Sequence, residues 1–383
     1  MSYELTEEQR ILRDTVRDFA ENEIAPVAQE LDENEEFPVE LTRQMGELGL
    51  FGMFVSEKYG GTEMGYVAYI IAVEELARVD GSQAATVAAG NSLGIGPIYY
   101  YGTEEQKQRY LPDLCEGKTL AGFGLTEPEA GSDAGGSKTT AKQREDGSWV
   151  INGSKIFITN SANPLSSVTT VQAVTGKRDD GKKEYTCFLV PAGTEGLTAQ
   201  EMHGKMMWRS SNTAELFFDD MVVPAEAILG ERGHGFKQML ETLDGGRLSI
   251  AAMGLGGAQG AYEKALEYAK ERSQFGRPIC KNQAIAFKLA DMATRIEAAR
   301  NMLYKACWQR ERGERFQKLA AMAKLYCSEV FRFVASEAVQ IHGGYGLMKE
   351  YDVERFFRDQ KLLEIGEGTS EVQRIVISRY IGC

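Results

Sequence analysis

The hydrophobic period of the chain changes twice, and this change constrains the fold more than any other feature. Residues 1–119 and 229–383 repeat apolar side chains at the helical period, whereas residues 120–228 hold short β-rich runs between turn residues. Helices and strands do not alternate, so the pattern excludes a parallel dinucleotide-binding sheet. The sequence therefore predicts an α+β protein of three domains with these bounds.

The first stretch is expected to begin with a capped helix. Thr6–Gln9 fits a capping box, in which the threonine hydroxyl and the glutamine amide satisfy backbone groups at the helix start. Further helices are expected at residues 66–79 and 104–115. Apolar side chains recur on one face of the first helix, at Leu12, Val16 and Phe19.

The central stretch contains a strong β-hairpin pattern. Asn152-Gly153 separates residues 149–151 from residues 155–159, and both residue types favour the positive φ angles of a tight turn. Further β-rich runs follow at residues 185–190 and 215–218. We therefore expect this domain to be built of β-strands.

The last stretch is expected to form four amphipathic helices in an antiparallel bundle, at residues 236–272, 281–312, 315–341 and 370–380. Within the first of them, Gly254–Gly260 imitates a dinucleotide-binding loop. Its sixth position is Gln259, however, and no strand precedes it, as that motif requires. Close packing of this helix against its neighbours is the better explanation of the glycines.

The composition narrows the possible partners. With 43 basic and 56 acidic residues the formal net charge is −13, which argues against nucleic acid or an anionic membrane as the main partner. No segment approaches the ~20 apolar residues of a membrane span, and the first residues do not resemble a signal peptide. Six dispersed cysteines suit a reducing cytoplasm, and three histidines without ligand spacing make a metal site unexpected.

One segment imitates a hydrolase motif. Gly90–Gly94 matches the G-x-S-x-G nucleophile elbow, with Ser92 in the place of the nucleophile. The elbow needs a strand before it and a helix after it, but an alanine-rich helical run precedes it here. A serine hydrolase that uses Ser92 is kept as the alternative from a different class of enzyme.

Three turn segments carry groups that suit a nucleotide-like ligand. Leu125–Asp133 offers backbone donors, hydroxyls and a glycine in one turn, which can hold a polar ring edge and a phosphate. Arg272–Pro278 ends a helix with two guanidinium groups that suit phosphate, although helix-terminal arginines also stabilise the helix dipole. Gln340–Gly346 closes another helix with a glycine-rich turn, which by itself is only a helix C-cap.

A carboxylate near the C-terminus stands on a glycine turn. Glu367 lies between Gly366 and Gly368, and Thr369 and Ser370 follow. Glycines allow the backbone to approach a ligand closely, so this carboxylate can be brought up to a reacting carbon. The same residues also fit an ordinary surface loop before a helix capped by Thr369 or Ser370.

Taken together and in this order, the segments resemble the acyl-CoA dehydrogenase family over essentially the whole chain. The resemblance implies an N-terminal helical domain, a central antiparallel β-barrel-like domain and a C-terminal four-helix bundle, usually in a homotetramer. It also implies FAD-dependent α,β-dehydrogenation of an acyl-CoA thioester, with electrons passed to an electron-transferring flavoprotein. The motifs that carry it are Leu125–Asp133, Asn152–Asn160, Leu243–Arg247, Arg272–Pro278, Gln340–Gly346 and Glu367–Thr369.

The resemblance also implies roles for individual residues, with Glu367 as the catalytic base. The implied FAD contacts within one subunit are Leu125, Thr126, Ser132, Phe157, Thr159, Thr369 and Glu371. The implied contacts to the FAD of a neighbouring subunit are Arg272, Phe275, Gln340 and Gly344. The implied substrate contacts are Ser132, Asp244, Arg247, Gly366 and Gly368.

The implied mechanism is physically consistent. A thioester α-proton is weakly acidic, so its removal by a carboxylate needs a raised base pKa and a stabilised enolate. A bound acyl chain expels water from around Glu367, and this desolvation should raise the pKa of the carboxyl. In the family the enolate is stabilised by the backbone N–H of the base and a flavin hydroxyl, and the β-hydride goes to flavin N5.

Two positions depart from the family pattern. Some relatives carry the base on an earlier helix, where this chain has Gly246, so Glu367 is the only candidate base. Relatives often have a large aromatic residue before the base, where this chain has Gly366. We therefore expect a wider cavity and a short, branched or alicyclic acyl-CoA as substrate. The alternatives within the same fold are an acyl-CoA oxidase and a non-catalytic CoA-binding protein.

Overall fold

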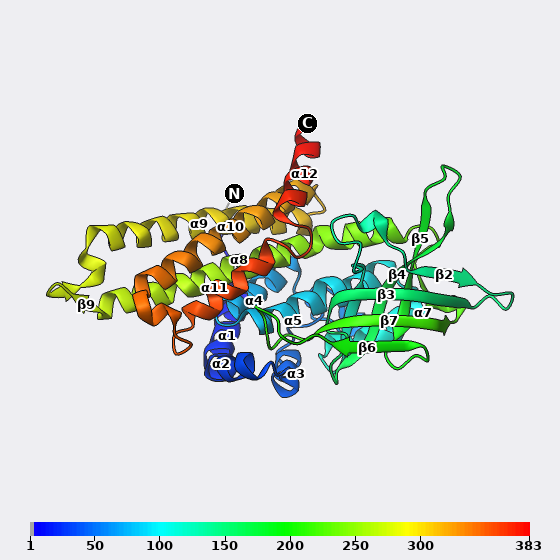
Figure 1. Ribbon diagram of the computed structural model, residues 1–383, viewed down its shortest axis with the longest axis horizontal. Helices are drawn as coiled ribbons and strands as arrows, with labels where there is room; N and C mark the ends of the chain where they lie inside the picture. Colours follow the sequence, from blue (N-terminus) through cyan, green and yellow to red (C-terminus); the bar gives the residue numbers. More distant parts are fainter. Residues whose placement is uncertain (1–3) are drawn as a thin grey trace.

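The computed structural model describes residues 4–383 and shows an elongated molecule, with long helices at one end and a sheet at the other (Figure 1). The capping box is formed, because Gln9 N donates to Thr6 Oγ1 and Thr6 N donates to Gln9 Oε1. The helices expected at residues 66–79 and 104–115 are also present. The N-terminal helices are α1 (Glu7–Phe19), α2 (Ala25–Asn34), α3 (Val39–Glu47), α4 (Tyr66–Ala77), α5 (Gly81–Ala89), α6 (Gly96–Tyr101) and α7 (Glu104–Cys115).

The central strands form one eight-stranded sheet in the order β6-β7-β3-β2-β4-β5-β8, with β1 paired to β4. Most neighbours are antiparallel, whereas β1 and β2 run parallel to β4. Trp149 and Phe188 pack edge to face in a separate hydrophobic core beneath the sheet. The strands are β1 (Leu120–Gly124), β2 (Thr140–Gln143), β3 (Trp149–Thr159), β4 (Ser166–Lys177), β5 (Lys183–Pro191), β6 (Leu197–Glu201), β7 (Thr213–Val223) and β8 (Ile228–Leu229).

The expected hairpin at Asn152-Gly153 is wrong. Strand β3 continues through this pair without interruption, and its pairing register with β7 shifts between Ile151 and Gly153. The Asn152 amide donates to Asp220 Oδ1 and its oxygen accepts from Asp220 N, at 3.0 and 2.8 Å. The Asn-Gly pair therefore forms a β-bulge, in which the positive φ that glycine permits bends the strand without reversing it.

The C-terminal helices form the bundle that the sequence predicts, with one helix more than expected. The missed helix, α11, packs against both α8 and α10, while α12 packs against α10. Helix α11 is short and rich in charged residues, but one of its faces is buried and includes Val353, Phe356 and Leu363. The helices are α8 (Gly235–Glu271), α9 (Gln283–Glu311), α10 (Gln317–His342), α11 (Val353–Leu363) and α12 (Ser370–Ile381), and the two-residue strands β9 (Ser273–Gln274) and β10 (Arg277–Pro278) join α8 to α9.

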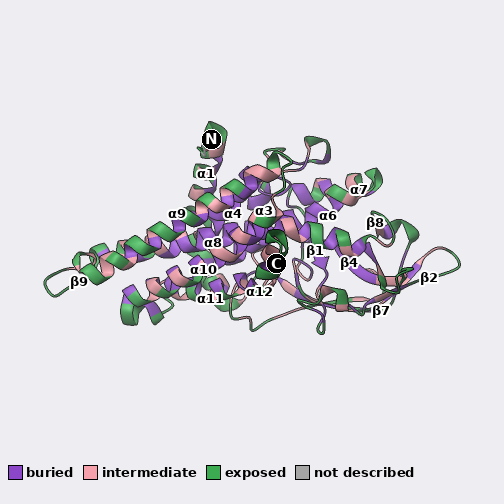
Figure 2. Ribbon diagram, turned by 90° about the horizontal axis from the view of Figure 1, so that it is seen from above, coloured by how far each residue is buried: buried purple, intermediate pink, exposed green. Residues whose placement is uncertain are grey.

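Helix α8 runs through the middle of the molecule and is buried over much of its length (Figure 2). A Cβ at Gly256 would lie 2.1 Å from Glu74 O, and one at Gly260 would lie 1.9 Å from Arg78 O. These glycines thus let the backbone of α4 and its C-terminal end touch α8. The predicted packing role of the Gly254–Gly260 segment is confirmed.

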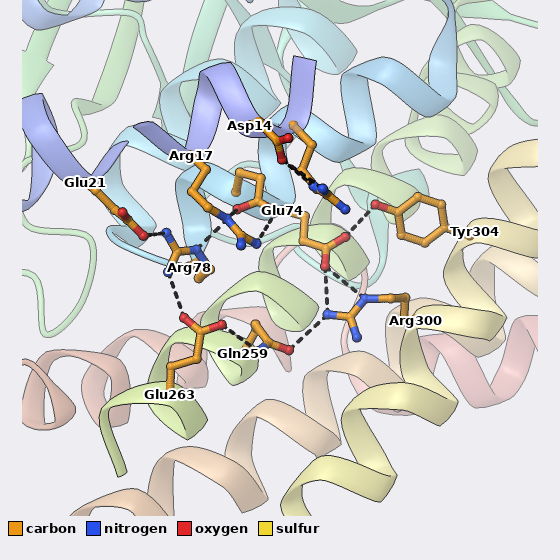
Figure 3. A network of polar contacts seen from close by, with 11 residues as sticks. Asp14, Arg17, Glu21, Glu74, Arg78, Gln259, Glu263, Arg300 and Tyr304 are labelled. Atoms are coloured by element: carbon orange, nitrogen blue, oxygen red, sulfur yellow. Dashed lines mark hydrogen bonds and ion pairs between the residues drawn. The ribbon is translucent and has the colours of Figure 1, made fainter. Parts of the chain in front are cut away.

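A network of ion pairs joins the N-terminal helices to the bundle (Figure 3). Arg78 contacts Glu21 and also donates to Glu263 of α8 at 2.7 Å. Glu74 of α4, which is buried, accepts from Arg300 of α9 at 3.0 Å. Because a buried charge is costly once its partner is lost, this network favours one arrangement of α4 against α8 and α9.

The fold class predicted from the sequence is confirmed, with helices on both sides of a largely antiparallel sheet along the chain. The structure does not test the predicted domain bounds at residues 119 and 228. Within residues 4–383, no helix combines the length and apolar character needed to cross a membrane.

Gly260→Ala tests the contact between α8 and the end of α4. We expect it to lower the free energy of unfolding by about 2 kcal/mol, because the new methyl group would collide with Arg78 O. The loss should appear although alanine is the better helix former by about 1 kcal/mol. Denaturant unfolding measures the change. Gly131→Ala is the control, since its new methyl group would have no non-neighbouring atom within 4 Å, and an equal effect in both variants would contradict the contact.

Candidate functional site

Glu367 lies in the turn between α11 and α12, with its backbone in the left-handed region. Its φ is 51° and that of Gly368 is 91°, so the turn uses glycine at one position and strains a glutamate at the other. Thr369 then caps α12, because its Oγ1 accepts from Val372 N at 3.2 Å. The expectation that Thr369 or Ser370 caps this helix is confirmed for Thr369.

The side chain of Glu367 points at α8. A Cβ at Gly246 would lie only 1.9 Å from Glu367 Oε2, so the carboxyl group rests against the bare backbone of the helix. Oε2 is shielded from solvent and finds no hydrogen-bond partner within residues 4–383. The next residue, Arg247, is buried and bonds Asp244 one turn earlier. Two of the predicted site residues, Glu367 and Arg247, therefore lie close together, and the third, Asp244, is bonded to Arg247.

Burial raises the pKa of Glu367 to about 7, while the nearby charges of Lys324 and Arg247 oppose the shift. Lys324 of α10 is itself fully buried, and this burial lowers its pKa to about 8. The carboxyl group can therefore accept and release a proton near neutral pH. This behaviour suits a general base, whose efficiency is greatest when its pKa is close to the working pH.

A cavity of about 390 Å³ lies against α8, and its lining reaches Asp244 and Gly245, the residues just before Gly246. The Arg310 guanidinium lies 3.9 Å from the centre of the Tyr66 ring, and its Nη1 has no hydrogen-bond partner within residues 4–383. Tyr66 OH in turn donates to Gly245 O at 2.7 Å. The cavity is lined by Phe54, Tyr66, Ser92, Gly96, Tyr100, Tyr101, Glu241, Thr242, Asp244, Gly245, Arg310, Phe316 and Gln317.

The Leu125–Glu127 turn is held by a buried ion pair. Lys155 Nζ on β3 donates to Glu127 Oε1 at 2.8 Å and to Leu125 O at 3.1 Å. Ile156 N donates to Thr126 O at 3.0 Å. These contacts fix the backbone of Leu125 and Thr126 while the Thr126 side chain remains partly exposed.

Phe157 and Thr159 continue along β3 beyond this turn. Phe157 has a φ of 61° and its ring is 63% exposed, which is unusual for a phenylalanine in a strand. Ser132 is exposed in the loop after the Leu125–Glu127 turn. This part of the sheet therefore presents an open aromatic face next to backbone and hydroxyl groups.

The residues predicted to contact the FAD of a neighbouring subunit lie at the far tip of the bundle, whereas Gly366, Gly368, Thr369 and Glu371 lie beside Glu367 in the sequence. Phe275, which is 96% exposed, sits in the β9–β10 turn at the end opposite the sheet (Figure 1). Arg272 lies 5.6 Å from the ring centre of Tyr345, in the same glycine-rich turn as Gly344. Gln340 is exposed near the end of α10. At a rise of about 1.5 Å per residue, roughly 40 Å of helix separates Arg272 from Gly246.

The structure does not support the hydrolase alternative. Ser92 lies in a π-helical turn, Gly90–Ile95, that continues from helix α5. Its Oγ donates to Ala88 O at 2.7 Å, as serines inside helices often do. A nucleophile elbow needs a strand before the serine, and this segment has a helix there.

Sequence reasoning missed the residues that hold the candidate site in place. These are Lys155 under the Leu125–Glu127 turn, and Lys324 and Gln373 under the Glu367 turn. The signal that could have found the lysines is a single basic residue inside an otherwise apolar run. Both are fully buried, which is rare for lysine unless a specific partner is present.

Comparison with known proteins identifies matches over nearly the whole chain. Models of the acyl-CoA dehydrogenase N-terminal, middle and C-terminal domains match residues 6–118, 122–221 and 233–382. The probable acyl-CoA dehydrogenase YngJ of Bacillus subtilis is 52% identical over 381 residues, which cover 100% of both chains. Butyryl-CoA dehydrogenase from Megasphaera elsdenii has a solved structure that is 45% identical, with a TM-score of 0.96 and complete coverage of both chains. A chain from a structural study of the electron transferring flavoprotein of Acidaminococcus fermentans is 44% identical, with the same TM-score and coverage.

Glu367→Gln tests the electrostatics of the carboxyl group. The pKa is raised from an ordinary 4.5 to about 7, so the stabilising contribution of the proton is complete below pH 4.5 and is lost as the pH rises through 7. The neutral amide does not suffer this loss. The stability of the variant relative to the unmodified protein should therefore increase between pH 5 and pH 8, by up to about 3 kcal/mol.

Urea unfolding of both proteins at pH 5 and pH 8 measures this change. Glu371→Gln is the matched control on the same segment, and it should lower stability by nearly the same amount at both pH values. Hydrogen bonds from its own backbone N–H and from Thr369 lower the pKa of Glu371, so the ionised carboxylate stabilises the fold. The glutamine amide would lack this stabilisation. The same stability difference at both pH values for Glu367→Gln would contradict the buried carboxyl group.

Proposed function

Because the chain belongs to the acyl-CoA dehydrogenase family, we propose that it oxidises a short acyl-CoA thioester with Glu367 as the base that removes the α-proton. The family assignment makes the protein an FAD-dependent oxidoreductase that acts on acyl-CoA. The observation that carries the role of Glu367 is its carboxyl group, which lies against Gly246 with an unpartnered oxygen and a pKa of about 7.

In the proposed reaction the Cα–H bond breaks and its proton passes to the Glu367 carboxylate. The electron pair remains on the thioester as an enolate, which needs nearby donors or positive charge. Arg247 and Lys324 lie close enough to the carboxyl group to lower its pKa, so they favour the ionised form before the proton moves. Bound FAD supplies the acceptor for the β-hydride, and the protein supplies orientation and electrostatics.

The part of the sheet described above fits a flavin. Leu125 and Thr126 offer fixed backbone groups, Phe157 an exposed ring, and Thr159 and Ser132 hydroxyls. Thr369 and Glu371 at the start of α12 are proposed as further FAD contacts beside the base. Asp244, Arg247, Ser132, Gly366 and Gly368 are proposed to hold the acyl-CoA.

We infer that a neighbouring copy of the chain completes the FAD site. Arg272, Phe275, Gln340 and Gly344 share the tip of the bundle, which is too far from Glu367 for both groups to hold one flavin within a single chain. The exposure of Phe275 supports a contact outside its own chain. A homotetramer, as the family resemblance implies, would bring these tips to the sheets of other subunits.

The substrate is proposed to be a short acyl-CoA that can carry a branch or a ring near Cα. A butyryl-CoA dehydrogenase is among the similar proteins, which supports a short chain. The three atoms nearest to a Cβ at Gly366 would all belong to Leu362, at 3.5 Å or more, so a side chain could leave the backbone here without a collision. This open position supports tolerance of a bulkier acyl group.

The electron acceptor is proposed to be an electron-transferring flavoprotein. The similarity to a chain studied with that flavoprotein supports it. A prolyl acyl carrier protein oxidase is 32% identical, so direct transfer to oxygen is the alternative within this fold. The cysteines of the described chain are free, which suits the reducing cytoplasm proposed as the location.

Anaerobic bleaching of the flavin by acyl-CoA substrates tests the proposed function. Butyryl-, isobutyryl-, isovaleryl- and cyclohexanecarboxyl-CoA are added in turn to the purified protein. At least one should bleach the flavin rapidly, and Glu367→Gln should slow this step by about 10²- to 10⁴-fold because no base removes the α-proton. A flavin that none of a wider set of acyl-CoAs bleaches, or a variant as fast as the unmodified protein, would contradict the proposal.

Gly366→Tyr tests the proposed substrate shape. The tyrosine ring would occupy the open position beside Cα, so bleaching by isobutyryl-CoA should fall at least about tenfold relative to bleaching by butyryl-CoA, equivalent to about 1.4 kcal/mol. Gly366→Ala is the matched control and should leave the ratio nearly unchanged, since its methyl group fits the existing space. An unchanged ratio in Gly366→Tyr would show that this position does not select the acyl group.

A further inference from the structure

Lys324 is a buried cation beside the proposed base. Its side chain is completely buried on α10, and Nζ donates to Gly368 O at 2.8 Å. Within residues 4–383 it makes no ion pair with a carboxylate, so its charge is not neutralised by direct contact. Burying an ammonium group in this way is costly, and the position therefore calls for a physical explanation.

The backbone carbonyl groups of Glu367 and Gly368, called the base turn below, supply part of the explanation. Gly368 O accepts from Lys324 Nζ and also from Gln373 Nε2 at 2.8 Å. Gln373 Nε2 additionally donates to Glu367 O at 3.2 Å. Two helices, α10 and α12, thus hold a turn in which two successive residues have positive φ. Without these donors, the glutamate would relax toward an ordinary backbone conformation.

Two further residues on the same face of α10 bond the segment that precedes Glu367. Ser328 Oγ, four residues after Lys324, donates to Leu363 O at 2.9 Å. Arg332 Nη1, four residues further, donates to Glu364 Oε1 at 2.9 Å. Residues spaced by four lie on one side of a helix. One stripe of α10 therefore holds the segment from the end of α11 to the base turn.

Lys324 also differs from the other charges near the base. Lys324 and Arg247 are the cations whose charges reach the Glu367 carboxyl group, and the Tyr69 hydroxyl on α4 also faces it. Arg247 is already paired with Asp244. The groups that act on Lys324 are Glu367, Arg247, Glu364 and Glu371.

Of the two acidic neighbours besides the base, Glu364 is held by Arg332 and Lys361, and Glu371 is exposed. The charge of Lys324 is therefore directed mainly at Glu367. Its fixed place under the turn means that this charge needs no rearrangement when the base loses or gains its proton.

We propose that Lys324 is a positioning residue for the α-proton abstraction, which holds the Glu367–Gly368 turn through Gly368 O and keeps the base ionised by its buried charge. This role deepens the proposed function and rests on it. Lys324 is protonated at the pH where the base ionises and makes no bond to the substrate, so the proton moves only from Cα to Glu367. The expected consequence of losing Lys324 is a base that ionises at higher pH.

The test is the pH dependence of flavin bleaching in Lys324→Met and Lys324→Gln, between pH 5.5 and pH 9. In both variants the midpoint of the rate profile should rise by about one pH unit, which makes bleaching about tenfold slower at pH 6. Near pH 9 the base is ionised in every protein and the difference should shrink. A midpoint equal to that of the unmodified protein, at whatever overall rate, would overturn the proposal.

Two control variants separate the charge from the packing. Lys318→Met removes an exposed charge from the same helix and should leave the midpoint unchanged. Ser328→Ala removes a hydrogen bond to the same segment without a charge, so it should lower stability but not move the midpoint. If Lys324→Met does not fold, Lys324→Gln still removes the charge while keeping a donor for Gly368 O. An equal midpoint shift in Ser328→Ala would show that loosened packing, and not the charge, is responsible.

A double-mutant cycle in stability tests the same coupling without substrate. The stabilising effect of Glu367→Gln at pH 8 should be larger in the Lys324→Met background, because the ionised base then has one cation fewer beside it. Additive effects would overturn the proposal. This readout does not depend on turnover, so a protein that no acyl-CoA bleaches would contradict the proposed function while the cycle still decides the role of Lys324.

Discussion

The close contact of α8 with its neighbours is the constraint on which the rest of the structure depends. Glycines at three levels of this helix let other groups touch its backbone. Gly260 contacts Arg78 just after α4, Gly256 contacts the last turn of α4, and Gly246 contacts the Glu367 carboxyl group. A methyl group at any of these positions would collide with a backbone or carboxyl oxygen. The glycines of α8 therefore allow both the close packing of the helices and the close approach of the candidate base.

The base combines two unfavourable features that the surrounding structure must compensate. Its backbone has a positive φ, and its carboxylate Oε2 is withdrawn from water without a hydrogen-bond partner within residues 4–383. Donors from Lys324 and Gln373 hold the turn, and the charges of Lys324 and Arg247 limit the rise in pKa. Strain and perturbed pKa at one residue, held by the elements around it, are typical of a catalytic group.

The sequence predicted the order of elements well, because periodicity and capping are local properties. The capping box at Thr6, the helix that Thr369 caps and the packing role of Gly254–Gly260 all follow from residues close in sequence. The Asn152-Gly153 hairpin failed because positive φ serves a bulge as well as a turn, and only the pairing with β7 decides between them. Helix α11 was missed because its apolar face is short and interrupted by charges.

The candidate site was predictable only in part. The glycine turn suggested Glu367, and the family resemblance supplied the other residues, but neither showed that Gly246 faces the carboxyl group or that Lys324 supports it. Those contacts join residues far apart in the chain, and no local pattern records them. The separation of the Arg272 tip from the base also became visible only when the length and direction of α8 were known.

The most direct test of the central claim, that Glu367 removes the α-proton, is an isotope effect. Flavin bleaching by butyryl-CoA is compared with bleaching by butyryl-CoA that carries deuterium only at Cα. Proton abstraction by Glu367 predicts slower bleaching of the deuterated substrate, since the Cα–H bond breaks in this step. Equal rates for the two substrates, under conditions where deuterium at Cβ slows the reaction, would contradict the account.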